Sequence, residues 1–411
     1  MIDDQAMTSH RRLLATLTAA AVLVTVSAGL AGADAPAPIP SAAAVTPAED
    51  AMLGRWHDMT DPAADAAVDD VYARNDVDAV NTALDSWTAN GQPLPTGLPT
   101  KLHDFLAANL ALPTFTDQTI VRRAAAFQAE HALAFLDASV LGSAPSRTRY
   151  PGITAGLVRD LGPNGDTPES GAKASQIVTA LMSADPLGPS GDLLVTALKV
   201  RLVHAAGRHL LQQGWDYARF GPPISVLYMA AEYQTFTIEV IDALARLSSP
   251  MSDAQAQDFI DVWRVIGTIL GLPIEAMPPT VAQTRQLGDV LNARLEDIDA
   301  TAKTYVAGNI AAQAKFFDPP IPEAIGQPLF AALTRTTLGD ADADAFAIPR
   351  DPFWDAVAEA GLPAVVGGVS TVQSLGFATS YMPMMATLLR KMLDDAQNAD
   401  IVLPPEFHPA G

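Results

Sequence analysis

The segment 199–209 holds residues whose types and spacing could do chemistry. It contains two of the seven histidines of the 411-residue chain, placed among arginines in an otherwise apolar stretch. At about 100° per residue, Arg201, His204 and Arg208 share one helical stripe roughly 60° wide. A neutral imidazole can ligate haem iron, and guanidinium groups can pair with the haem propionates. The stripe therefore indicates a haem site, with His204 as the iron ligand.

The same residues also suit a purely structural role. A buried histidine often bonds a backbone carbonyl, and carboxylates of a neighbouring helix can meet buried arginines as well as propionates can. The chain offers many such carboxylates, with 46 acidic against 25 basic residues. His209 lies about 140° around the helix from His204, so the two cannot hold one metal. We expect His209 and His131 to be structural, and His57, His103 and His408 to lie at the surface.

Composition excludes several classes of protein. The chain has no cysteine, which rules out disulfides, zinc knuckles, iron–sulfur clusters, thiolate-ligated haem and covalent c-type haem. Any haem is therefore held without a covalent bond to the chain, by His or another ligand that is not Cys. The net charge of −21 repels phosphate backbones and anionic lipids, so we expect no nucleic-acid partner. We find no His-Glu-x-x-His, Gly-x-Ser-x-Gly, Walker or dinucleotide-binding motif.

The first 33 residues predict an export signal. Arg11-Arg12 precedes an Ala- and Thr-rich apolar run, and Ala31-Gly-Ala33 places the cleavage before Asp34. The paired arginines are typical of a twin-arginine signal, and an ordinary Sec signal is the alternative. Translation starts at Met1 or Met7. We therefore expect a secreted or envelope-associated protein.

The mature chain predicts an all-α protein. Ala and Leu dominate, with Pro and Gly as breaks between helices of ordinary length. After an Ala/Pro-rich linker at 34–46, we expect a single large, globin-like domain at 47–400 around a buried haem site, then a tail at 401–411. No part of the mature chain has the ~20 uncharged residues of a membrane span. Expected helices are short ones within 47–110, then 118–136, 192–213 (capped by Asp192), one from after Pro223 to about 247, and 253–269 (after a Ser252–Gln255 capping box). Residues 281–317 predict one long polar helix or a helix pair, with short pieces beyond Pro319 and a last helix at 382–393.

From about Trp56 to Leu393 the chain resembles the latex-clearing protein (rubber oxygenase) and MpaB-type oxygenase family. The resemblance rests on five segments in a fixed order, of which Val-Arg-x-x-His-Ala-x-x-Arg is the most specific. They are Trp56-His-Asp-Met-Thr-Asp61, Leu112-Pro-Thr-Phe-Thr-Asp117, Lys199-Val-Arg-Leu-Val-His-Ala-Ala-Gly-Arg208, Gly221-Pro-Pro-Ile-Ser225, and Val262-Trp-Arg-Val-Ile-Gly267 followed by Leu270-Gly-Leu-Pro273.

The resemblance implies an all-α haem b protein with His204 as the proximal ligand and Arg201 and Arg208 at propionates or at groups behind the ligand. Latex-clearing members carry Arg-x-x-Lys-Thr near the haem, where dioxygen binds. Here Lys173 is kept, and we expect it to act there, but Ser170 and Ala174 replace the Arg and Thr. Other family positions also differ: a histidine appears as Asp261, a glutamine as Val226, and Tyr150-Pro-Gly-Ile-Thr154 occupies the region of the expected Glu base.

Three hypotheses follow. The first is an exported haem b oxygenase that cleaves carbon–carbon double bonds of an isoprenoid or polyisoprene substrate with dioxygen, entering through an apolar tunnel. The second is a homologue that binds haem or a lipid without cleaving polymers, since Ser170 and Ala174 alter the distal side. The third is a non-enzymatic exported scaffold in which His204 is a core residue and the arginines pair with acids.

Overall fold

A computed structural model describes residues 45–162, 176–316, 322–366 and 401–407, and all regular elements in these ranges are helices. The predicted all-α fold is confirmed. In chain order the elements are α2 (Pro47–Asp58), α3 (Pro62–Ala73), α4 (Val77–Asp85), α5 (Thr100–Ala108), α6 (Gln118–Glu130), α7 (Ala132–Asp137), the π-helix η1 (Ala138–Ser143), α8 (Ala144–Ser146), the 3₁₀-helix η2 (Arg147–Arg149), α9 (Pro151–Leu161), α11 (Gln176–Leu181), α12 (Leu193–Leu211), α13 (Tyr217–Phe220), α14 (Val226–Phe236), α15 (Ile238–Arg246), α16 (Asp253–Ile269), η3 (Ile274–Ala276), α17 (Val281–Leu295), α18 (Ala300–Phe316), α19 (Glu323–Leu338), α20 (Asp340–Ala345) and α21 (Pro352–Val366).

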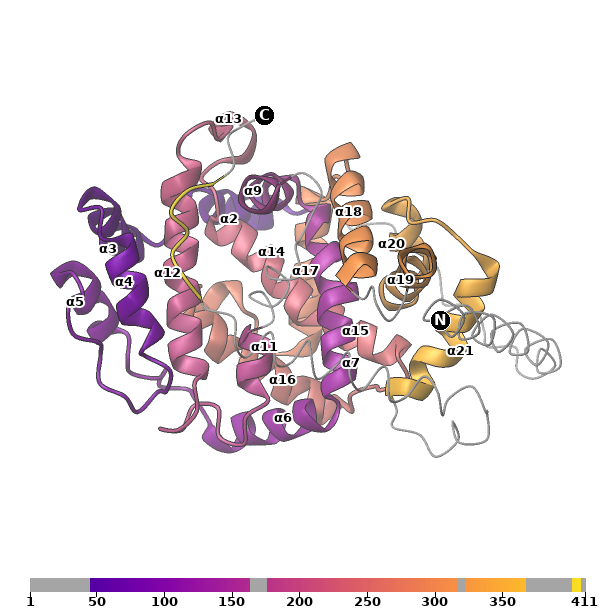
Figure 1. Ribbon diagram of the computed structural model, residues 1–411, viewed down its shortest axis with the longest axis horizontal. Helices are drawn as coiled ribbons and strands as arrows, with labels where there is room; N and C mark the ends of the chain where they lie inside the picture. The colour runs from indigo at the N-terminus through magenta and orange to yellow at the C-terminus, as the bar shows by residue number, and fades with distance from the viewer. Residues whose placement is uncertain (1–44, 163–175, 317–321, 367–400, 408–411) are drawn as a thin grey trace, which may run out of the picture.

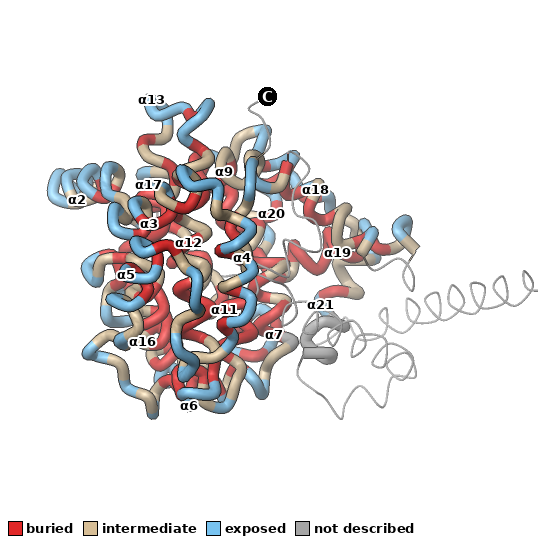
Figure 2. The backbone as a smooth tube through the Cα atoms, turned by 60° about the vertical axis from the view of Figure 1, so that its left-hand side comes forward, coloured by how far each residue is buried: buried red, intermediate tan, exposed pale blue. Residues whose placement is uncertain are grey.

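Helix α12 carries the 199–209 segment and is the longest helix in the described part. It packs against α3 on one side and against α11 and α16 on the other. In Figure 1 the N-terminal helices α3–α5 lie to the left of α12, while α18–α21 lie to its right. Figure 2 shows that α12 and α11 are buried over much of their length, whereas α2 and α13 are largely exposed at the rim. The predicted haem segment thus lies in the interior.

Several predicted helix starts are confirmed. The Asp117 side chain accepts hydrogen bonds from the backbone N–H groups of the first turn of α6. Ser252 and Gln255 form the complete capping box that starts α16. The polar stretch 281–317 is a helix pair, α17 and α18, as one of the two predicted alternatives. These starts could be predicted because a cap depends on a few adjacent residues.

Three predicted helices differ from the structure. The one expected from 118 to 136 breaks at His131, and the one expected to run to Leu247 breaks at Thr237, where φ is −116° and ψ is −78°. The region beyond Pro319, expected as short pieces, contains the 16-residue α19 with Pro328 inside it. Pro328 lies in the first two turns, where few backbone bonds are lost, and the buried residues behind it hold the helix.

Residues 401–407, assigned above to a tail, lie against α3 and α4. The backbone of Leu403 exchanges two hydrogen bonds with the Asn81 side chain, and the Tyr72 hydroxyl donates to the Pro404 carbonyl. Leu403 is 1% exposed. In Figure 1 this segment runs along α12 in yellow. The chain is thus anchored to its first helices by its last described residues.

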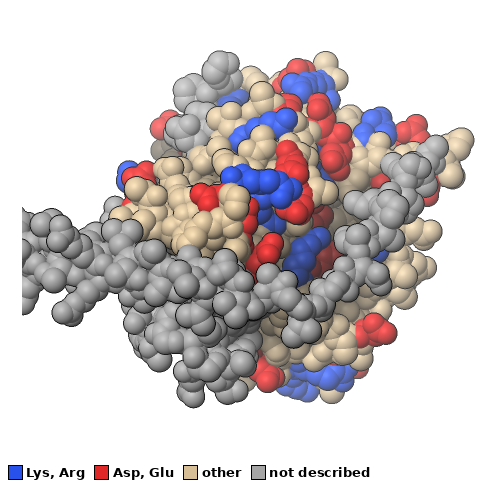
Figure 3. Space-filling view, turned by 90° about the vertical axis from the view of Figure 1, so that its right-hand side faces the viewer, with Lys and Arg blue, Asp and Glu red and all other residues tan. Residues whose placement is uncertain are grey.

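Charged side chains of both signs lie on the described surface. Figure 3 shows acidic and basic side chains interspersed over the described part of one face. Among the described helices, none is both long and apolar enough to cross a bilayer. The export signal at 1–33 and the helix expected at 382–393 fall outside the described residues.

Candidate functional site: a histidine at an apolar cavity

Helix α12 is held at its start by a residue far away in the sequence. Asp192 occupies the N-cap position as expected, but its side chain makes no capping bond. Instead, the Asn90 carboxamide oxygen accepts from the N–H groups of Leu194 and Val195, at 3.1 and 3.3 Å. The same side chain donates to the carbonyl oxygens of Pro186 and Gly188. The loop around Asn90 therefore fixes the N-terminal end of the helix that carries His204.

His204 lies in the middle of α12 with no hydrogen bond from either ring nitrogen to any described residue. Its Nδ1 is fully enclosed and without a partner. Burial, followed by the positive charge of Arg208, lowers the pKa of His204 to about 4, and Asp61 opposes this only in part. The imidazole is therefore neutral at neutral pH, and no described residue engages its N–H or its nitrogen lone pair. A buried histidine in a structural role would be expected to have such a partner.

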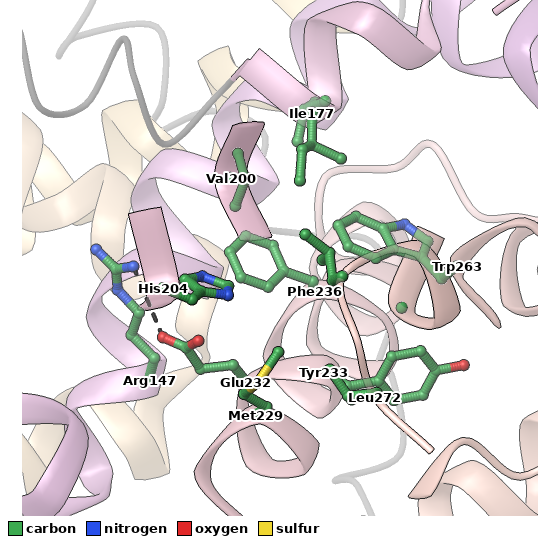
Figure 4. Close-up of a pocket in the computed structure, with 13 residues that line it drawn as sticks. Arg147, Ile177, Val200, His204, Met229, Glu232, Tyr233, Phe236, Trp263 and Leu272 are labelled. Atoms are coloured by element: carbon green, nitrogen blue, oxygen red, sulfur yellow. Dashed lines mark ion pairs between the residues drawn. The ribbon is translucent and has the colours of Figure 1, made fainter. Parts of the chain in front are cut away.

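The His204 ring borders a cavity of about 160 Å³. Its walls come from η2, α11, α12, α14, α16 and the loop after α16 (Figure 4). Most lining side chains are apolar, and two of the aromatic rings, Phe236 and Trp263, stack at 5.3 Å. The lining residues are Arg147, Ile177, Val178, Val200, His204, Met229, Glu232, Tyr233, Phe236, Trp263, Gly267, Leu270 and Leu272. The His204 imidazole therefore faces a cavity whose other lining side chains are mostly apolar.

Charged groups gather at the His204 end of the cavity. Arg147 and Glu232 form an ion pair there, with 4.0 Å between Nη1 and Oε1 (Figure 4). Burial raises the pKa of Glu232, and Arg147 opposes the shift. Phe236, Trp263 and Ile177 lie farther from this pair in Figure 4. The described cavity wall is thus polar beside the histidine and apolar elsewhere.

Arg201 and Arg208 do not line the cavity but pair with carboxylates of α3. Arg201 Nε lies 2.6 Å from Asp61 Oδ2, and Arg208 Nε lies 2.6 Å from Asp65 Oδ1. Arg201 also donates to the Asn109 side chain and to the Ile269 carbonyl. The neighbouring-helix acids that the sequence left open as partners are therefore present. Whether a propionate also meets these arginines stays a prediction.

Arg201 and Arg208 differ in how many of their guanidinium nitrogens have a partner among the described residues. All three nitrogens of Arg201 are engaged, Nη2 with the second oxygen of Asp61 at 3.3 Å. Arg208 uses Nε for Asp65 and Nη1 for the Ile224 carbonyl, while its buried Nη2 has no partner among the described residues. An unpaired buried guanidinium nitrogen is costly unless an acceptor meets it. Arg208 thus retains one donor suited to an anion.

The other predicted residues lie elsewhere. His131 bonds the Phe127 carbonyl at 3.0 Å, and His209 bonds Asp69 at 2.7 Å; neither lines the cavity. His57 and His103 are at the surface, as expected. Lys173, like Ser170, Ala174 and His408, falls outside the described residues. The described residues contain no group of three or more His, Asp and Glu side chains able to hold a bare metal ion.

The donor chemistry of the site suits haem. A neutral imidazole without a partner is the ligand that haem iron takes from a protein, and the apolar wall suits a porphyrin face. The cavity as it stands has room for a molecule of about the size of benzene. A porphyrin therefore requires the lining side chains, such as Met229, Phe236 and Leu272, to move outward.

The part of the chain that holds most of the cavity is similar in sequence to known oxygenases. A sequence model described as "ER-bound oxygenase mpaB/B'/Rubber oxygenase, catalytic domain" matches residues 175–370. The chain is therefore similar to the MpaB and rubber oxygenase family over slightly less than half of its length. The rubber oxygenase of Streptomyces sp. (strain K30) is 28% identical to it over 319 residues, which is 76% of this chain and 75% of that protein. A solved latex clearing protein LCP in its closed state shares the fold, with a TM-score of 0.68 at 23% identity over 82% of this chain and 91% of the other. The matched residues 175–370 include His204 and every cavity residue except Arg147.

Sequence reasoning missed the groups that surround the stripe. Asp61 and Asp65 stand four residues apart, at the N-cap and in the first turn of α3, a spacing that predicts a common helix face. An acidic face opposite a basic stripe was a usable signal, but a chain with 46 acidic residues offers many such faces. Arg147 and Glu232 reach the cavity only through tertiary packing, so no local pattern could have predicted them.

Proposed function

We propose that this protein is an exported haem b oxygenase that uses dioxygen to cleave carbon–carbon double bonds of an isoprenoid-type substrate. The observation that carries the proposal is the neutral His204 imidazole, without a hydrogen-bond partner among the described residues, at the wall of an apolar cavity. The similarity to the MpaB and rubber oxygenase family supports the oxygenase class. The Arg11-Arg12 signal supports export.

The roles proposed for the residues follow from their surroundings. His204 holds the iron through Nε2, and Arg201 and Arg208 hold α12 in place from behind. The Nη2 of Arg208 is the part of that pair still available to a propionate. Haem, when bound, supplies the centre at which dioxygen is activated. By resemblance, Lys173 acts on the face where dioxygen binds.

The walls of the cavity suit an apolar substrate. Phe236, Trp263 and Leu272 exclude water and provide dispersion contacts for an unsaturated hydrocarbon chain. Glu232 and Arg147 are the described charged groups that remain near the reacting end. We propose that they orient the polar groups present there, because a charged pair in an apolar wall is the feature that can fix a direction.

The first test is the absorption spectrum of the purified mature protein, with a pyridine haemochrome assay. We expect a Soret band and close to one haem b per chain. His204→Ala should abolish the spectrum, because it removes the ligand without adding volume. His209→Ala is the matched control on the same helix and should keep full haem content. A His204→Ala protein with normal haem content would overturn the ligand assignment.

A second candidate is a family member that binds or oxidises a small lipid or terpenoid but does not cleave polymers. The small cavity and the residues Ser170 and Ala174 favour it. Oxygen uptake with polyisoprene, compared with short isoprenoids, separates the two candidates. The Arg–Asp pairs are also what the scaffold hypothesis expects. A protein that stays colourless after haem addition supports that scaffold and rejects both haem proposals.

A further inference from the structure

Three acidic residues follow one face of α3 and meet three cationic or protonatable residues of α12. Asp61, Asp65 and Asp69 stand at four-residue intervals, which places them one above another on a helix. Their partners are Arg201, Arg208 and His209, in the same order. We call these three pairs the α3–α12 ladder. Its first two rungs flank His204 on α12.

The first rung is the more completely enclosed. The side chains of Arg201 and Asp61 are 12% and 11% exposed, and two nitrogen–oxygen contacts join them in a fork. Arg201 also lies 5.1 Å from the centre of the Phe105 ring. A two-contact Arg–carboxylate pair fixes direction as well as distance. Asp61 therefore sets the position of α12 one turn before His204.

The second rung lies one turn after His204. Arg208 is 6% exposed at its side chain and Asp65 is 25% exposed. Removing one partner of a buried ion pair leaves an uncompensated charge, which costs more than the pair contributes. Arg208 therefore depends on Asp65 to remain where it is.

The charges of these rungs lie close to His204 along α12. Arg201 stands three residues before His204 and Arg208 four residues after it, so both lie within about one helical turn of it. A Coulomb interaction falls off as the inverse of distance, and it is screened less in a poorly solvated interior than in water. The ladder therefore bears on both the place of the imidazole and the electrostatic potential around it.

We infer that Asp61 and Asp65 are positioning residues of the His204 site, acting through Arg201 and Arg208 on the geometry and potential of the iron ligand. The inference rests on the proposed function, since it concerns the haem that His204 would hold. It assigns a role to α3, which contributes no residue to the cavity wall. Groups behind a metal ligand commonly alter metal affinity by 10- to 100-fold.

The test compares Asp61→Asn and Asp65→Asn with the wild-type full chain loaded with haem. Two quantities are measured: the ferric/ferrous midpoint potential and the rate of haem transfer to excess apomyoglobin. Loss of a negative charge near the iron favours the reduced state, so the potential should shift positive in both variants. Haem loss should be about tenfold faster or more. Asp69→Asn, on the same face of α3 but with a partly exposed partner, is the matched control and should behave as wild type.

A double-mutant cycle on Asp65 and Arg208 separates an effect of charge from poor folding of one variant. Arg208→Gln should shift the potential in the negative direction, and Arg208→Gln combined with Asp65→Asn should return it toward the wild-type value. Ion pairs that only stabilise the fold would lower the melting temperature but leave the potential unchanged, and that outcome would overturn the inference. A wild-type chain without haem would instead reject the proposed function, and the inference with it.

Discussion

At the scale of single residues, the site depends on an imidazole that the protein keeps neutral and leaves without a hydrogen bond. Enclosing a polar nitrogen with no partner among the described residues costs on the order of 1–3 kcal/mol, and the fold bears this cost at His204. The residue types and their helical spacing predicted the stripe of His204, Arg201 and Arg208. They could not predict which anions the arginines meet, because that depends on how α3 packs.

Gly271 is a residue at which the packing of the first ladder rung can be tested. Its φ is +95°, and a Cβ there would lie 2.8 Å from Asp61 Oδ2 and 2.9 Å from Arg201 Nε. These atoms are fixed in a buried pair and cannot move aside freely. We expect Gly271→Ala to lower the free energy of unfolding by about 2–4 kcal/mol, the sum of backbone strain and overpacking.

Gly97 provides the control for this substitution. Its φ is +87°, yet no atom lies within 4 Å of the position its Cβ would take. Gly97→Ala should therefore show the backbone strain alone, about 1 kcal/mol. Urea denaturation of both variants measures the difference, and equal losses would show that contact with the ladder has no cost.

Asp137 predicts a pH dependence of stability. Burial raises its pKa to about 7, and its Oδ2 is enclosed without a partner in the described structure. The folded state therefore holds a proton more tightly than the unfolded state does. Stability falls as pH rises from about 4 to about 7, by roughly 3 kcal/mol, and is then constant.

Asp137→Asn should remove this dependence. The difference in unfolding free energy between wild type and variant should decline between pH 4 and pH 7 and be flat above pH 7. Denaturant titrations at pH 4.5, 6 and 8 measure it. A difference that does not change with pH would contradict the expected protonation of Asp137.

At the scale of elements, the predicted helices were right where short-range chemistry decides and wrong where packing decides. The capping box at Ser252 and the cap at Asp117 depend on adjacent residues only. The breaks at His131 and Thr237 and the continuous α19 through Pro328 depend on neighbouring helices, which no local pattern records. The cavity could not be predicted for the same reason, since its wall draws on several elements.

Arg149 joins several elements, although the sequence did not single it out. Its side chain, 5% exposed, contacts Glu239 of α15, Glu296 after α17 and Asp342 of α20. Arg149→Met leaves these carboxylates without their cation, and burial already raises the pKa of Glu239. We expect a loss of about 3–5 kcal/mol in urea denaturation at neutral pH.

Arg350 is the matched control for this element junction. It pairs with Asp340 and Asp344 of α20, but its side chain is 52% exposed. Arg350→Met should cost less than about 1 kcal/mol, as exposed pairs do. Similar losses in the two variants would mean that burial does not set the strength of these pairs.

At the scale of the whole molecule, the composition predicted the all-α class and excluded cysteine-dependent chemistry, because both follow from residue counts. The counts could not predict that residues 401–407 lie on α3 and α4. We expect Asn81→Ala to remove both backbone bonds to Leu403 and to cost about 1–3 kcal/mol. Hydrogen exchange at residues 401–407 should rise in this variant but not in Ser86→Ala, whose hydroxyl bonds only its own helix.

The position of residues 401–407 has a consequence for the order in which the chain matures. Asn81 and Leu403 are 322 residues apart, and Tyr72 and Pro404 are 332 apart. A ribosome therefore releases α3 and α4 long before residues 401–407. Until that segment is made, the Tyr72 hydroxyl and the Asn81 side chain lack their hydrogen bonds to Pro404 and Leu403. The entropy of closing a loop rises only slowly with its length, so the long separation lowers the final stability little. It does mean that these contacts form late in folding. A segment made late thus completes the packing of helices made early.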